Sequence, residues 1–153
     1  MKRVILLIAM VAGVTLLANA QLSNHKSLGL HLGNATEVTY QHPLSESTRL
    51  EFNLGISSWG NSFTGINGLH QWVWDLSDLA NGFNWYLGAG AGIGSKSGSF
   101  AAAVMGQIGI EYDLLKETEV PLLISLDYRP DFLLVPGAET RFEVVGLGIR
   151  YKF

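Results

Sequence analysis

The sequence predicts an all-β protein: an eight-stranded, antiparallel, up-and-down transmembrane β-barrel. Large apolar residues recur at every second position in one segment after another, which is the period of a strand with one apolar face. In the C-terminal segment 145–153, the positions between them hold glycine, Arg150 and Lys152. A barrel surrounded by lipid turns its apolar face outward and its polar face inward. Charges inside the alternation therefore favour a membrane barrel over a soluble barrel or sandwich, whose apolar face needs a second layer to cover it.

Residues 1–20 are predicted to form a cleaved signal peptide. Lys2 and Arg3 precede an apolar run over residues 4–17, and the small residues of Ala18-Asn19-Ala20 follow it. This is the layout of a secretory signal, and a run of about 14 residues falls short of the roughly 20 that a transmembrane helix needs. We therefore expect an exported chain whose mature part, 21–153, forms one domain.

The composition excludes several classes of function. The net charge is −3 and becomes more negative without Lys2 and Arg3, so nucleic acid is a poor partner. The chain has no cysteine, which excludes a disulfide scaffold, a thiolate metal site and a lipid anchor. The four histidines are scattered without a pair at ligand spacing, so we predict no metal and no cofactor.

Alternation and turn signals divide the first half of the mature chain into four strands. The cleanest alternation is 49–56; the other three are predicted at 28–33, 38–42 and 63–75. If Gly33-Asn34 is not a turn, residues 28–42 form one bent strand and the barrel has seven strands. Eight is preferred because bacterial single-chain outer-membrane barrels have an even number.

The second half reads as four more strands, at 85–94, 100–112, 122–131 and 141–153. Gly- or Ser-containing turns at 77–82 and 95–98, and a charged turn at 114–120, separate them. The loops predicted at the end away from the chain termini are all short. Since loops carry most recognition, a receptor or adhesin role has little surface available.

Aromatic residues gather at both ends of the predicted strands. Membrane barrels carry girdles of aromatic side chains at the two headgroup levels, whereas a soluble core would scatter them toward strand middles. One rim receives Tyr40, Trp72, Trp74, Trp85, Tyr112, Tyr151 and Phe153, and the other receives Trp59, Phe63, Phe100 and Phe132. We expect Trp59, Trp72, Trp74, Trp85, Tyr112 and Tyr151 to mark the membrane interfaces.

Charged side chains of both signs fall on the predicted inner face. Eight strands enclose an interior that side chains just fill, and buried charges are costly unless they pair. The sequence therefore predicts a closed lumen held by ion pairs, with a gated narrow pore as the alternative. The predicted network consists of Arg49, Glu51, Glu111, Asp127, Arg129, Asp131, Arg150 and Lys152, with Asn53, Gln71, Gln107 and Ser125 among them.

Glycine occupies every second position from 88 to 94 and leaves an inner strip without side chains. Two interpretations stay open. The strip makes room for Tyr86, Arg129 or Arg150, or it opens a small pocket.

No catalytic residue is predicted. The glycine-rich run 87–98 lacks the Gly-Lys-Ser/Thr order of a phosphate loop, because Ser95 precedes Lys96. A hydrolase or acyltransferase needs a nucleophile beside a base and an orienting acid. No local signature joins the residues that would have to converge for that purpose, which are Ser57 or Ser125, His31, and Asp127 or Asp131.

The last six residues, 148–153, resemble the β-signal that outer-membrane proteins present to the barrel-assembly machinery, in which Gly148, Tyr151 and the terminal Phe153 occupy the signal positions. Gly146 stands where that signal usually has a polar residue. The mature chain is similar to small outer-membrane barrels of the OmpA transmembrane-domain type, without a periplasmic domain.

This resemblance implies a monomer in the outer membrane of a Gram-negative envelope, with membrane lipids and the assembly machinery as partners. Such porin-like families host structural proteins, small channels and lipid-modifying enzymes, so the fold does not decide the function. A structural or envelope-interaction role is the leading interpretation. A lipid-modifying acyltransferase or deacylase and a narrow small-solute channel are the alternatives.

Overall fold

A computed structural model describes residues 25–33, 36–56, 63–142 and 145–153. The predicted signal peptide, Ser57 and Trp59 lie outside these ranges. Apart from a short 3₁₀ helix, η1 (Leu114–Lys116), the regular elements of the described chain are strands. These are β1 (Ser27–Leu32), β2 (Thr36–Pro43), β3 (Thr48–Ile56), β4 (Phe63–Asp75), β5 (Phe83–Lys96), β6 (Ser99–Asp113), β7 (Leu122–Tyr128), β8 (Asp131–Val135), β9 (Glu139–Arg141) and β10 (Val145–Lys152).

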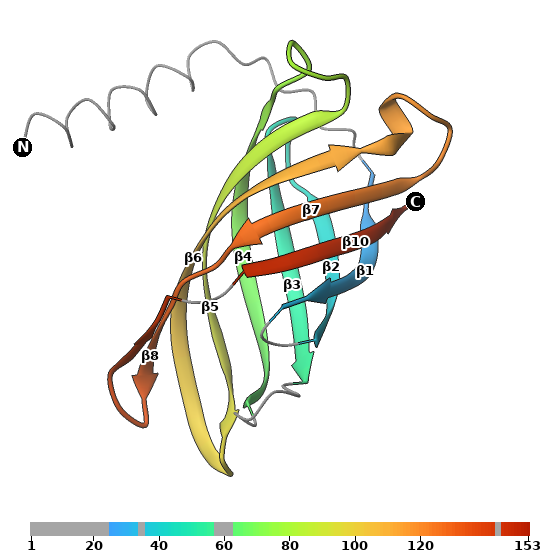
Figure 1. Cartoon of the computed structure of the whole chain (residues 1–153). Helices are drawn as coiled ribbons and strands as arrows, with labels where there is room; N and C mark the ends of the chain where they lie inside the picture. The colour runs from blue at the N-terminus through green and yellow to red at the C-terminus, as the bar shows by residue number, and fades with distance from the viewer. Residues whose placement is uncertain (1–24, 34–35, 57–62, 143–144) are drawn as a thin grey trace, which may run out of the picture.

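The strands form a closed antiparallel barrel (Figure 1). Each strand from β1 to β7 pairs with the next, β10 pairs with β7, and β1 closes the ring by pairing with β10. The predicted fold class is therefore confirmed. β1 also pairs antiparallel with β2, with Leu30 opposite Val38. The chain therefore reverses between Leu32 and Thr36, so the barrel has eight strands rather than seven.

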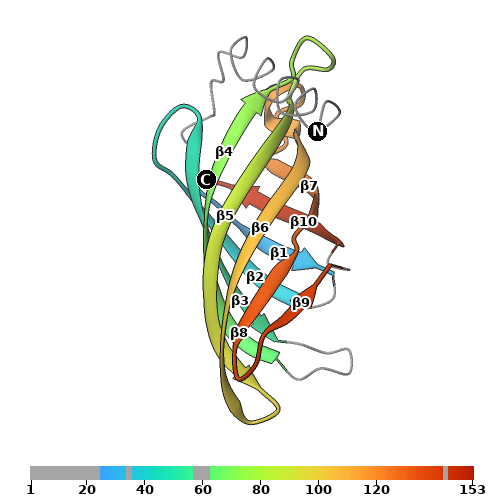
Figure 2. The same cartoon turned by 90° about the vertical axis from the view of Figure 1, so that its left-hand side faces the viewer.

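The seventh wall of the barrel differs from the predicted continuous strand 122–131. β7 ends at Tyr128 and β8 begins at Asp131, and Pro130 lies between them. Proline has no N–H to donate to a ladder, and its carbonyl instead accepts a hydrogen bond from the N–H of Gly106 (3.0 Å). β8 continues along β6, and β9 pairs with β8, so a hairpin extends the wall beyond β7 (Figure 2).

The turn between β5 and β6 is tighter than the predicted turn 95–98. The strands continue to Lys96 and resume at Ser99, which leaves only Ser97 and Gly98 between them. Both have positive φ angles, 51° and 82°. Two such residues match the right-handed twist of the flanking strands, so this pair lets the two longest strands form one hairpin.

The strands differ greatly in length around the ring. β5 and β6 have 14 and 15 residues, whereas β1 and β2 have six and eight. The β5–β6 hairpin extends beyond the tips of β1 and β10 in both views (Figures 1 and 2). The wall of the barrel is therefore tall on one side and low on the other.

Candidate functional site

The barrel is inverted relative to a water-soluble protein. Along β10 the apolar residues Val145, Leu147 and Ile149 are exposed on the outer surface, whereas Arg150 is fully buried inside. All the other strands long enough to show a pattern alternate in the same sense over most of their length. The structure places all eight residues of the predicted network in the interior, at most 8% exposed, together with Asn53, Gln71, Gln107 and Ser125.

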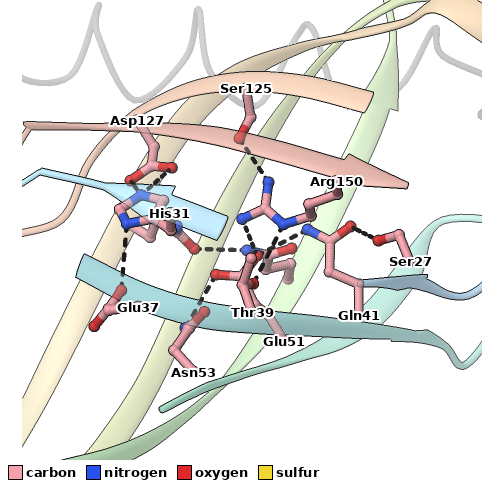
Figure 3. A network of polar contacts seen from close by, with 12 residues as sticks. Ser27, His31, Glu37, Thr39, Gln41, Glu51, Asn53, Ser125, Asp127 and Arg150 are labelled. Carbon is pink, nitrogen blue, oxygen red and sulfur yellow. Dashed lines mark hydrogen bonds and ion pairs between the residues drawn. The ribbon is translucent and has the colours of Figure 1, made fainter. Parts of the chain in front are cut away.

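Arg150 is fully buried in the interior and contacts polar side chains from three other strands (Figure 3). Its Nη2 donates to Glu51 Oε2 (2.9 Å), and both side chains are completely buried. Its Nη1 and Nε donate to the hydroxyl oxygens of Ser125 (2.7 Å) and Thr39 (3.2 Å). Glu51 also accepts from Gln41 Nε2 (2.8 Å). A buried ion pair needs such additional partners to offset the desolvation of its two charges.

Arg49 forms the second pair, with Glu111 across the barrel. Its Nη1 and Nη2 donate to the two carboxylate oxygens of Glu111 (3.0 and 2.6 Å), and its Nε donates to Gln71 Oε1 (2.5 Å). This two-bond geometry is the strongest form of an arginine–carboxylate contact. The guanidinium also lies over the ring of Tyr86, 5.1 Å from its centre. The contact links this pair to the cluster around Asp127.

His31 joins two carboxylates on the inner face of β1. Its Nδ1 lies 3.2 Å from Glu37 Oε2, and its Nε2 lies 3.1 Å from both oxygens of Asp127 (Figure 3). Glu37 also accepts from Arg129 Nη2 (2.5 Å), and Asp127 accepts from the Tyr86 hydroxyl (2.9 Å). Ionised carboxylates only accept hydrogen bonds, so a doubly protonated imidazole satisfies both contacts.

Among the interior ion pairs of the described residues, three members are absent from the predicted set: His31, Glu37 and Asp113, the last of which pairs with Lys152. The signal that could have found them is the alternation itself. His31 lies between the outward residues Leu30 and Leu32, and Glu37 precedes Val38. With a protonated His31, each cation in these contacts has a carboxylate partner. The cations are Arg49, Arg129, Arg150, Lys152 and His31, and the carboxylates are Glu37, Glu51, Glu111, Asp113 and Asp127.

Glycines on the inner face provide the space for these large side chains. A Cβ at Gly146 would overlap the ring of His31, and one at Gly109 would lie about 2.5 Å from the ring of Tyr86. Position 146, where the resembled signal usually has a polar residue, therefore has no room for one here.

The glycine strip of β5 has a different role from both predicted interpretations. A Cβ at Gly90 would lie 2.8 Å from the Leu69 side chain, and one at Gly92 would lie 2.8 Å from Asn67. A Cβ at Gly88 would meet Gln107 of β6 at 3.0–3.2 Å. Side chains of β4 and β6 therefore lie against Gly88, Gly90 and Gly92, rather than Tyr86 or the arginines.

A small cavity opens at the end of the barrel where His25 and Phe153, the two ends of the described chain, lie; this end is called the end with the termini. Its volume is about 20 Å³, and its lining includes Ser27, Gln41, Arg49, Glu111 and Lys152. A space of this size holds about one water molecule. It ends against the Arg49–Glu111 pair.

Aromatic side chains mark both ends of the outer surface. At the end with the termini, Trp74 and Trp85 stack with ring centres 4.4 Å apart, and Trp72, Tyr151 and Phe153 are 42–58% exposed. Tyr112 is half-buried at the same end. At the opposite end, Phe100 and Phe132 are exposed, and Phe142 packs edge-on against Phe132. Trp59 and the side chain of Phe63 are not described.

The described residues do not assemble the Ser–His–acid group that the alternative enzyme interpretation would require. The hydroxyl of Ser125 accepts a hydrogen bond from Arg150, and both nitrogens of His31 face carboxylates. Ser57 lies outside the described ranges. Within those ranges, no group of three or more His, Cys, Asp and Glu side chains is arranged to hold a metal ion, and no helix is long and apolar enough to cross a membrane.

Comparisons with known proteins do not assign this chain to a family. The chain matches no family model, no curated protein and no solved structure.

Proposed function

We propose that this protein is an integral outer-membrane β-barrel with a structural or envelope-interaction role, whose lumen is closed by paired charges. The observation that carries the proposal is the inversion of the barrel. Leucine, isoleucine and valine cover its outer surface at 38–57% exposure, while most of its buried side chains are charged or polar. Soluble monomers rarely expose apolar patches beyond a few hundred Å². Apolar surface that is unfavourable in water is favourable in a membrane, because lipid solvates the outer face of the barrel.

The interior contacts support a barrier rather than a pore. Arg150–Glu51 joins β10 to β3, Arg49–Glu111 joins β3 to β6, and Arg129 joins the turn after β7 to Glu37 on β2. These bonds cross the lumen in different directions. An ion passing through would have to break at least one buried pair, and each partner left alone would be an uncompensated charge.

The end of the chain supports insertion by the barrel-assembly machinery. Tyr151 and Phe153 are 54% and 58% exposed on the outer surface, and β10 closes the ring by pairing with β1. Under this proposal the partners are outer-membrane lipids and that machinery, and the barrel is a monomer located in the outer membrane of a bacterial cell.

Gel mobility of the detergent-extracted outer-membrane fraction, boiled against unboiled, tests the proposal. A closed barrel held by buried pairs and a full ladder resists detergent until it is heated, so we expect the unboiled form to migrate differently. A sample unfolded in urea before loading provides the reference for the unfolded chain. Protein recovered from the soluble periplasm, with identical mobility before and after boiling, would overturn the proposal.

A further inference from the structure

The low side of the barrel wall is too short for an undisturbed membrane. A strand rises about 3.3 Å per residue and tilts by about 40° in a barrel, so each residue adds about 2.5 Å of height. The six residues of β1 then cover about 15 Å and the 15 residues of β6 about 37 Å. The apolar band of an outer-membrane barrel is about 25 Å tall. β6 exceeds that height and β1 falls well short of it.

Much of the missing height lies at the end away from the chain termini. At the end with the termini, the turn between β4 and β5 also extends beyond the end of β10 (Figures 1 and 2). At the other end, the β5–β6 and β8–β9 hairpins extend beyond the tips of β1 and β10 (Figures 1 and 2).

The outer face of the low wall is as apolar as that of the tall wall. Leu28, Leu30 and Leu32 of β1 are 43–48% exposed, and Val38 of β2 is 48% exposed. Immediately beyond Leu32 the chain turns back to Thr36. In a membrane of uniform thickness, the polar backbone at Gly33 and Thr36, where the described part of this wall ends, would lie in hydrocarbon, where unsatisfied backbone groups cost several kcal/mol each.

We infer that the face formed by β1, β2 and the start of β10 contacts a locally thinned leaflet. Headgroups bend down to the level of Leu32 there, whereas on the β5–β6 side they lie near Phe100. Local thinning costs only fractions of a kcal/mol per Å of mismatch, less than burying the turn. The partner of this face is therefore a bilayer with short acyl chains or with chains compressed beside the barrel. This inference rests on the proposed membrane location.

Spin labels on two outward positions test the thinning directly. Because the chain has no cysteine, Leu32→Cys and Ala91→Cys each create one labelling site. Leu32 ends the low wall, and Ala91 lies near the middle of β5 on the tall wall, exposed on the same outer surface. In dioleoyl phosphatidylcholine vesicles, we expect a polar nickel relaxant to reach the label at 32 several-fold more effectively than the label at 91, with oxygen showing the opposite order.

Equal protection of both labels from the nickel relaxant would overturn the inference. The gel shift of the same samples separates this result from failure of the proposed function. A shifted band with both labels protected contradicts only the thinning, whereas an unshifted band contradicts membrane insertion itself.

The unmodified protein provides a second measurement that does not depend on the variants. We expect its unfolding temperature, followed by the gel shift, to be higher in dilauroyl than in dioleoyl phosphatidylcholine, because the thinner bilayer matches the low wall. An unfolding temperature that is equal in the two lipids, or higher in the thicker one, would contradict the inference.

Discussion

Leu126 and Asp127 are neighbours in β7 and lie in opposite environments. Leu126 is 48% exposed on the outer surface, whereas Asp127 is 3% exposed and holds the His31 ring and the Tyr86 hydroxyl. The same contrast recurs around the barrel between its outer and inner faces. Under the proposed membrane location, outer side chains are interchangeable as long as they are apolar, because lipid offers them no fixed partner. Inner side chains depend on particular partners, so each substitution there leaves another group without its contact.

The largest expected effect comes from removing one member of the Arg150–Glu51 ion pair. Glu51→Leu leaves the Arg150 guanidinium buried without a carboxylate, which costs about 3–5 kcal/mol of unfolding free energy. Urea unfolding of the folded barrel in detergent measures the loss. The double variant Glu51→Leu/Arg150→Leu is the control, because it removes both charges, and we expect it to recover a large part of the stability. A single variant as stable as the unmodified protein would show that the pair does not hold the lumen closed.

The single variant Glu51→Leu also distinguishes a barrier from a pore. We expect no single-channel conductance for the unmodified barrel in a planar bilayer and a measurable conductance for Glu51→Leu where it remains folded. Steady conductance of the unmodified barrel, unchanged in the variant, would favour the small-solute channel instead.

We expect a charge placed on the outer face to lower the free energy of unfolding less than a charge left without its partner inside the barrel. It should lower that free energy more than a charge placed on a turn. Leu126→Arg puts a guanidinium at the middle of the outer wall, where lipid would surround it, at an expected cost of about 2–4 kcal/mol. Leu79→Arg is the matched control, because Leu79 is 76% exposed in the turn between β4 and β5. If both substitutions leave stability in lipid vesicles unchanged, the outer face does not contact hydrocarbon.

Of the substitutions at positions 51, 126 and 146, we expect the smallest loss of unfolding free energy at position 146, which borders the ring of His31. Gly146→Ala places a methyl group against the imidazole, and overpacking of this kind typically costs about 1–3 kcal/mol. Gly137→Ala is the control, because a Cβ there meets nothing within 4 Å. The two variants are compared by urea unfolding. Equal stability would mean that the ring moves aside without losing its contacts with Glu37 and Asp127.

Much of this barrel is determined by local patterns in the chain. The alternation of apolar and polar residues predicts which face of each strand points outward, because side chains alternate strictly between the two faces. It also places Arg49, Glu51 and Arg150 on the inner side before any fold is known. Gly33-Asn34 and Ser97-Gly98 mark reversals through their turn preferences.

Only the tertiary structure decides which of the inner residues meet. Arg150 and Glu51 are 99 positions apart, and Arg49 and Glu111 are 62 apart. Their contacts depend on the register of all eight strands and on the tilt that closure imposes. The same holds for His31, whose two carboxylates come from β2 and β7, and for Gly90, whose space is filled by Leu69 of the neighbouring strand. Alternation determines, for each residue, whether its side chain points outward or into the lumen. Which side chains pair across the lumen depends on the geometry of the closed ring, and no single segment of the chain contains that geometry.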